Sequence, residues 1–109
     1  MFGGNKVEKV EKLVAKKNVK GLSALLTSKD PAVLEAAVRG LGQCDGDDAY
    51  NGIVPFVRNA NPALRIAAVE AMVAIQRGRV HIDHQIAKET DPKVLEVLRG
   101  AQTKLKDRN

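Results

Sequence analysis

The stretch that decides the fold runs from Asn61 to Met72 and reads NPALRIAAVEAM. Residues 30–41 read DPAVLEAAVRGL, the same pattern 31 positions earlier, and a third Asx-Pro pair, Asp91-Pro92, follows 30 positions later. Asp and Asn accept hydrogen bonds from the free amides of a first helical turn, and proline fits the first helical position. Because apolar residues follow each pair at helical spacing, we expect helices at about 31–43, 62–77 and 92–106.

Shorter helical segments between these helices repeat at the same offset. Adding 31 carries Val19, Leu22, Leu25 and Leu26 onto Tyr50, Ile53, Phe56 and Val57, and it carries Val7, Val10 and Leu13 into the series of long helices. A fixed period near 30 residues is typical of stacked helical repeats. We therefore predict one all-α domain over residues 1–109, an α-solenoid of about seven helices. Its units are expected at about 1–17 (half a unit), 18–44, 47–77 and 79–107.

The composition fits this class of protein. Apolar residues make up 44% of the chain, charged residues 28% and aromatic residues only 3%. A β-sandwich would be richer in aromatic and β-branched residues, so packed helices are favoured. There is a single cysteine, and neither a secretory leader nor a membrane-spanning stretch is expected. We predict a cytoplasmic protein.

Positive charge is concentrated at the start of the chain. The net charge is +5, and residues 1–29 alone carry seven Lys against two Glu. Lys9, Lys12, Lys16 and Lys20 are three, four and four residues apart, so they can form a basic stripe that binds phosphates or anionic headgroups. No arginine or aromatic side chain supports base recognition there, and whether the stripe continues past Asn18 stays open. A solubilising surface is the favoured interpretation.

Three groups of residues have chemistry that suggests a site, and each has a simpler structural explanation. Cys44 shares a column with apolar residues, which predicts a packing thiol. His81 and His84 can share a helical face, but Asp83 points elsewhere, and no Cys or further His completes the three or four converging ligands that zinc needs. The acidic run Asp45–Asp48 has no bidentate Glu at the twelfth position of a calcium loop. We therefore expect no enzyme activity, no cofactor, and no catalytic, cofactor-binding or metal-binding residue.

The repeated pattern is similar to that of a known family. The consensus Asp-Pro-x-Val-(Arg)-x-x-Ala-Val-x-x-Leu fits residues 30–41 well and residues 61–72 best. It resembles a HEAT repeat, and the short period is closest to the HEAT-like repeats of phycobilisome lyases. The resemblance implies a right-handed solenoid of roughly three and a half repeats. It also accounts for Pro55, because a proline that kinks the first helix of a unit is common in HEAT repeats.

The chain departs from the family pattern in two places. An Arg often follows the conserved Val in the family and pairs with an Asp of a neighbouring repeat. Only Arg65 holds that position here, while Leu34 and Leu95 hold the other two, which puts the polar ladder in doubt. These leucines either form an apolar edge for self-association or pack inward. The third unit is expected to be irregular, because Asp83 and His84 align with the apolar pair at 53–54.

The resemblance places a binding surface on the second helices, which line the concave face of HEAT solenoids. The outward positions there include the small residues Ala32, Ala36, Ala63 and Ala67. The predicted partner-binding residues are Glu35, Arg39, Ile66, Glu70, Glu96 and Val97, with Ile66 as an apolar centre between acidic neighbours. We predict a non-catalytic scaffold or adaptor for a protein or peptide, acting as a monomer or weak homo-oligomer. The alternatives are nucleic-acid or anionic-surface binding through the lysine stripe, and an accessory subunit of a lyase-type enzyme.

Overall fold

The computed structural model describes the backbone of residues 2–105 and the side chains of residues 7–105. These residues form seven α-helices, two short 3-10 helices and no β-strand, so the predicted all-α fold of about seven helices is confirmed. The elements in chain order are α1 (Phe2–Ala15), α2 (Val19–Ala24), η1 (Leu25–Thr27), α3 (Pro31–Gly42), α4 (Asp47–Ile53), η2 (Val54–Arg58), α5 (Pro62–Ile75), α6 (Arg79–Ile86) and α7 (Pro92–Lys104).

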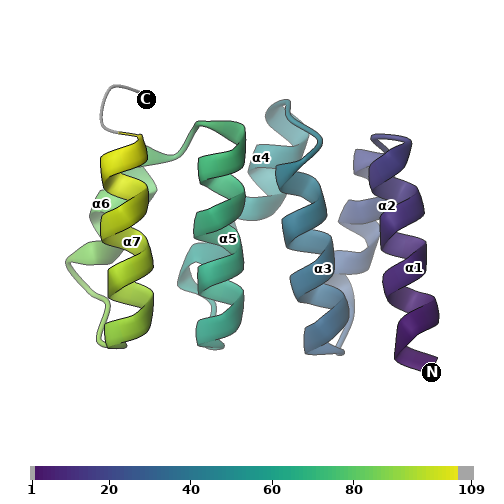
Figure 1. Cartoon of the computed structure of the whole chain (residues 1–109), viewed down its shortest axis with the longest axis horizontal. Helices are drawn as coiled ribbons and strands as arrows, with labels where there is room; N and C mark the ends of the chain where they lie inside the picture. Colours follow the sequence, from purple (N-terminus) through teal and green to yellow (C-terminus); the bar gives the residue numbers. More distant parts are fainter. Residues whose placement is uncertain (1, 106–109) are drawn as a thin grey trace.

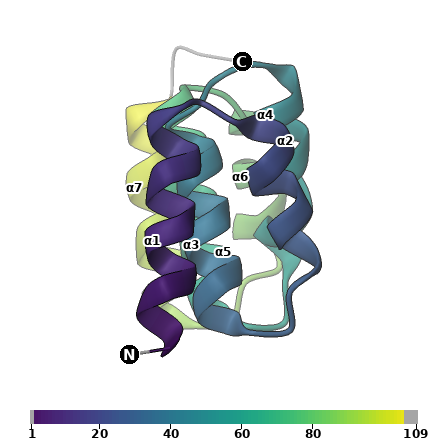
Figure 2. The same ribbon diagram turned by 90° about the vertical axis from the view of Figure 1, so that its right-hand side faces the viewer.

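Long and short helices form two layers (Figures 1 and 2). The long helices α1, α3, α5 and α7 lie side by side in chain order in one layer, and α2, α4 and α6 form the other. Each long helix packs against the next one along the chain. The helix pairs therefore stack sequentially, as the units of a solenoid do. The right-handed turn of the solenoid and the unit boundaries stay predictions.

The Asx-Pro pairs begin the long helices as the sequence predicts. The side-chain oxygens of Asp30, Asn61 and Asp91 accept hydrogen bonds from amides two residues onward, at 2.9, 2.9 and 2.8 Å. The proline of each pair occupies the first turn. The helices end one or two residues before the predicted positions. In α5 the cause is Gln76, whose left-handed backbone (φ 66°) stops the helix after Ile75.

A second set of hydrogen bonds recurs in the loops, two residues before each capping residue. The side chains of Ser28, Asn59 and Glu89 each accept a hydrogen bond from the backbone amide of the capping residue two positions later, at 3.1, 2.8 and 3.1 Å. These three residues recur at intervals of 31 and 30, like the caps themselves. The repeat therefore extends into the loops and fixes how the chain enters each long helix.

The short helices tighten into 3-10 geometry before they end. α4 stops at Ile53, and the chain continues through Pro55 as η2, which agrees with the predicted kink. The same change occurs between α2 and η1 without any proline. Pro55 thus suits this point of the unit, but the tightening belongs to the repeat itself.

The hydrophobic core lies between the two layers. The short helices contribute Leu22, Ile53 and Ile82, and the long helices contribute Leu41, Val69, Met72 and Leu98, among other side chains that are fully buried. In the third unit the buried place held by Ile53 one unit earlier is taken by Ile82, so the core side chain is shifted by one residue from the aligned position. Asp83 and His84, which were aligned with the apolar pair at 53–54, are exposed. The spacing of these two core positions is 29 residues and not 30.

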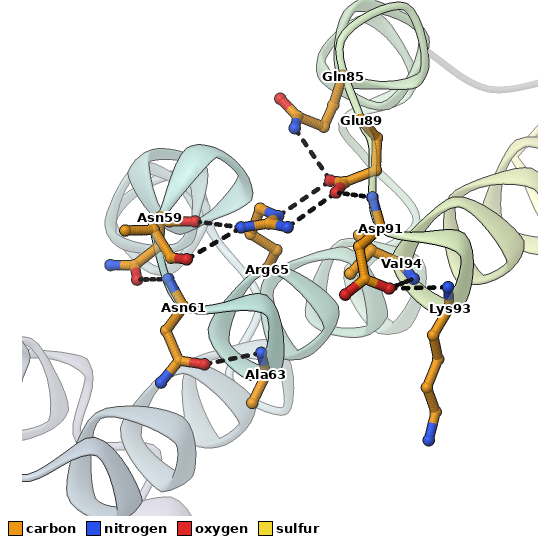
Figure 3. A network of polar contacts seen from close by, with 10 residues as sticks. Asn59, Asn61, Ala63, Arg65, Gln85, Glu89, Asp91, Lys93 and Val94 are labelled. Carbon is orange, nitrogen blue, oxygen red and sulfur yellow. Dashed lines mark hydrogen bonds and ion pairs between the residues drawn. The ribbon is translucent and has the colours of Figure 1, made fainter.

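A buried ion pair joins the first turn of α5 to the loop that precedes α7 (Figure 3). The guanidinium of Arg65 donates to both carboxylate oxygens of Glu89, at 2.9 and 2.8 Å, and to the backbone oxygens of Asn59 and Ala60. The two charged side chains are only 13% and 1% exposed. Gln85 donates a further bond to Glu89 at 3.1 Å. The single Arg at the ladder position therefore does pair with the following unit.

The pKa of Glu89 reflects this enclosure. Burial alone would raise it, but hydrogen bonds from Arg65, Gln85 and the Asp91 amide, together with the charge of Arg65, lower it below the ordinary value of 4.5. Glu89 is therefore ionised at neutral pH, and its ion pair with Arg65 persists.

No helix among residues 2–105 combines the length and the apolar character that crossing a membrane requires.

Candidate partner-binding surface

The predicted binding residues occupy three neighbouring long helices. Glu35 and Arg39 lie on α3, Ile66 and Glu70 on α5, and Glu96 and Val97 on α7. The side of these helices that faces away from the short-helix layer is called the long-helix face below (Figure 2). Any molecule that binds across it would contact at least two units of the stack.

Three of the six residues form a polar bridge across the seam between α3 and α5. Arg39 donates to Glu35 at 3.1 Å, one turn away on the same helix, and to Glu70 on the next helix at 2.7 Å. All three side chains are between 40 and 49% exposed, so the pairs contribute about 0–1 kcal/mol of stability each. Their main effect is to hold the Arg39 guanidinium at a defined point of the surface.

The charge of Arg39 is also fixed. Burial alone would lower the pKa of Arg39, but its hydrogen bonds to Glu70 and Glu35 and their negative charges raise it. The guanidinium therefore keeps its charge at any physiological pH.

A groove of about 460 Å³ lies between α5 and α7, beside this bridge. Its lining is largely apolar or small and includes Val69, Val73, Ala74, Val97, Gly100 and Ala101. Arg39, Glu70 and Lys104 complete the lining with charged groups of both signs. We call this feature the α5–α7 groove. Apolar lining with a few polar groups is the usual make-up of a binding cleft.

A smaller groove of about 280 Å³ lies between α1 and α3, lined in part by Val7, Val10, Val14 and Ala36. Arg39 lines this groove as well as the α5–α7 groove. The bridge at the seam of α3 and α5 therefore separates two apolar depressions on the long-helix face.

The remaining predicted residues have different surroundings. Val97 lines the α5–α7 groove with Arg39 and Glu70, and Glu96 is exposed on α7 outside the groove lining. Ile66 is half-buried and packs against the core, and it lines neither groove. The outward placement of Ala67 is wrong, because this residue is completely buried.

Sequence reasoning missed Val73, Ala74, Gly100 and Lys104 as surface residues of the groove. The sequence does carry a signal, because the middle long helix, residues 62–75, is apolar nearly all round. In the structure Val73 is half-buried and Ala74 is exposed. The apolar side that no other helix within residues 2–105 covers is the part that lines the groove.

The four stripe lysines are exposed but do not share one helix. Lys9 and Lys12 lie on α1, Lys16 follows its last residue, and Lys20 lies on α2. The chain reverses between the helices at Lys17, which has a left-handed backbone (φ 53°) and donates to the carbonyl of Gln43 at 2.6 Å. The stripe therefore bends at this turn, and anion binding by it stays a prediction.

Two of the three residues with metal-ligand chemistry, His81 and Asp83, make contacts within the fold. Asp83 accepts bonds from Arg79 at 2.9 Å and from Gln102 of α7 at 2.8 Å, which lower its pKa. The His81 ring lies 6.1 Å from that of Tyr50. Within residues 7–105, no three His, Cys, Asp or Glu side chains are grouped so that they could hold a metal ion.

The lone cysteine and the acidic run are also engaged in the fold. Cys44 is half-buried, packs against the core and donates to the carbonyl of Gly40 at 3.4 Å, and burial raises the pKa of its thiol. Asp47, at the start of α4, pairs with Arg77 at 2.8 Å. Neither arrangement resembles an activated nucleophile or a cation site.

Comparison of the sequence with known protein families identifies the same kind of repeat that the stacked helices and their recurring caps show. The model of the HEAT-repeat family matches residues 19–108. The chain therefore belongs to the HEAT-repeat family. No curated protein and no solved structure matches it. The likeness to phycobilisome lyases, and the accessory role that it implies, stay predictions.

Proposed function

We propose that this chain is a non-catalytic scaffold that binds a partner protein or peptide in the α5–α7 groove. HEAT-repeat domains generally act as protein-interaction scaffolds, which gives the class of function. The α5–α7 groove carries the proposal, because it joins an apolar lining to charged groups of both signs on two adjacent units. A partner helix can place apolar anchors against Val73 and Val97 while its polar flanks meet Arg39, Glu70 and Lys104.

The electrostatic layout suggests how a partner would be oriented. Arg39 already has two carboxylate partners, at 3.1 and 2.7 Å, so the bridge carries one negative charge in excess. Lys104, at the end of α7, takes part in no ion pair among residues 7–105. An acidic residue of the partner would therefore find its best match at the Lys104 end of the groove.

The test blocks the groove without removing core packing. Ala74 lines the groove and is exposed on α5, so Ala74→Glu adds bulk and charge there while glutamate still favours helix. Ala24, exposed at the end of α2 in the short-helix layer, receives the same substitution as a control. We expect Ala74→Glu to lower partner affinity at least tenfold and Ala24→Glu to leave it unchanged, as measured by quantitative capture from the native host.

Both variants should melt within a few degrees of wild type, since neither position is buried. Equal capture of the same partner by wild type and by Ala74→Glu would exclude the α5–α7 groove as the binding site.

A further inference from the structure

A separate pocket of about 180 Å³ lies in the short-helix layer. It shares no residue with the α5–α7 groove. Two lining residues, Val57 and Arg58, belong to η2, and the others are His81, His84, Gln85 and Lys88 from α6 and the turn after it. Four of the six carry basic groups and none is acidic. We call this feature the basic pocket.

The sequence of α6 brings the basic groups together. His81, His84, Gln85 and Lys88 are spaced three, four and seven residues from the first, which puts them on one face of a helix. The backbone bond from the Lys88 amide to the Gln85 carbonyl, at 3.0 Å, continues the turn beyond the end of α6. Arg58 is the last residue of η2, which packs against α6 and so supplies the opposite wall.

The carboxylates of α6 and its following turn are already used elsewhere. Asp83 is bound by Arg79 and Gln102, and Glu89 is bound by Arg65. In contrast, Arg58, His84 and Lys88 take part in no ion pair within residues 7–105. The positive charge of the basic pocket is therefore not neutralised by the described part of the chain.

The surroundings of His81 show the effect of this uncompensated charge. Burial lowers the pKa of His81, and the nearby charges of Arg58 on η2 and His84 on α6 lower it further. On the side of α4 the neutral Tyr50 ring lies 6.1 Å away, and the Arg77 guanidinium lies 4.1 Å from the centre of that ring. On the side of α7, Gln102 binds Asp83. A bound anion would offset the positive charge that Arg58 and His84 place near His81.

We propose that the basic pocket binds one phosphate-type oxyanion, held by the Arg58 guanidinium and the Lys88 ammonium, with His81 and His84 as further donors. A guanidinium can donate two parallel hydrogen bonds to a phosphoryl group, and an ammonium adds a point charge. The volume is below the roughly 300–1,000 Å³ of sites for drug-sized ligands, which suits a single oxyanion. The site is distinct from the proposed partner-binding groove, and its source of phosphate is either free phosphate or a phosphorylated side chain of another protein.

To test this proposal, inorganic phosphate is titrated into the full chain at constant ionic strength and about pH 6.5. Binding is measured from the chemical-shift changes of the backbone amides by NMR. We expect saturable shifts centred on residues 58, 81, 84 and 88. Arg58→Gln should weaken binding about tenfold or more, because it removes a hydrogen-bonded charge. Arg99→Gln removes the same charge from an exposed site on α7 and should bind phosphate like wild type.

The histidine ring signals give a second readout. Phosphate should raise the apparent pKa of His81 in wild type, and the rise should be reduced in Arg58→Gln. If Arg58→Gln proves poorly folded by circular dichroism, Lys88→Gln replaces it with the same expectation. Shifts that spread over the lysines of α1 without saturation, or equal weakening by Arg58→Gln and Arg99→Gln, would overturn the proposal.

A final arm distinguishes the two sources of the phosphoryl group. A phosphoserine peptide and its unphosphorylated form are titrated in the same way. Tighter binding of the phosphopeptide than of free phosphate would identify a phosphorylated protein as the ligand, and equal binding would identify free phosphate. Either result supports the basic pocket, provided that the unphosphorylated peptide does not bind there.

Discussion

Arg65 links neighbouring units through an enclosed ion pair. Its guanidinium donates to the backbone of the loop before α5 and to the carboxylate of Glu89, in the loop before α7 (Figure 3). Glu89 in turn accepts a hydrogen bond from the backbone amide of Asp91, the residue that caps α7. Replacing a buried ion pair by apolar residues is often harmless, but removing one partner leaves an uncompensated buried charge. The sequence marked Arg65 as the one residue at the ladder position. It could not identify Glu89, because the pairing depends on how the first turn of α5 meets a loop residue 24 positions later in the chain.

We expect Arg65→Met to lower the free energy of unfolding by about 3–5 kcal/mol, since Glu89 would lose its partner while its side chain stays buried. The measurement is urea unfolding at pH 7 followed by circular dichroism. Arg99→Met, at an exposed position, is the control and should change stability by no more than about 0.5 kcal/mol. A loss below about 1 kcal/mol for Arg65→Met would show that the ion pair adds little.

The same pair predicts how stability depends on pH. The pKa of Glu89 is lower in the folded state than its ordinary value of 4.5, so the unfolded chain binds this proton first. The contribution of Glu89 is therefore complete above that ordinary value and is lost as pH falls through the lowered folded-state pKa. Urea unfolding at a series of acidic pH values should show a shallower decline for Glu89→Gln than for wild type. Parallel declines would contradict this assignment.

At the scale of the helices, the sequence predicted where the long helices begin, but it did not predict which side chain of α6 enters the core. The Asx-Pro caps act within two or three residues, so the starts of α3, α5 and α7 could be derived from the sequence. The core position of α6 depends on which side chain reaches between the layers. Adding a fixed offset of 30 to Ile53 assigns this core position to Asp83, whereas the structure buries Ile82 there. A short helix can rotate to bury its apolar side chain, so the spacing between units is not constant.

The approach of α3 to α5 gives a test at this scale. A β-carbon on Gly42 would lie 2.9 Å from the Cα and Cβ of Ala71, and backbone atoms cannot yield easily. We expect Gly42→Ala to cost about 1–3 kcal/mol through overpacking. Gly100 on α7 has open space around it, so Gly100→Ala should stabilise the helix by about 0.5–1 kcal/mol. Thermal unfolding of the two variants should move the melting temperature in opposite directions, and a shared direction would contradict the close packing of α3 and α5.

At the scale of the whole molecule, stacking in two layers decides which surface is open to a partner. Each long helix is covered by its neighbours and by the short-helix layer, so the remaining side of α3, α5 and α7 forms a continuous face across units (Figure 2). The resemblance to HEAT repeats predicted that the second helix of each unit carries the binding face. It did not predict the groove, since Val73 and Ala74 read as core residues until the positions of α5 and α7 were known.

Site-specific photo-crosslinking in the native host tests the central claim most directly. A benzophenone amino acid replaces Ala74 in one variant and Ala24 in another, so that the groove and the short-helix layer are each probed at an exposed alanine. We predict a discrete crosslinked protein with the probe at position 74 and none of that product at position 24. Equal crosslinking from both positions, or a discrete product from position 24 alone, would contradict the proposal that partners bind on the long-helix face.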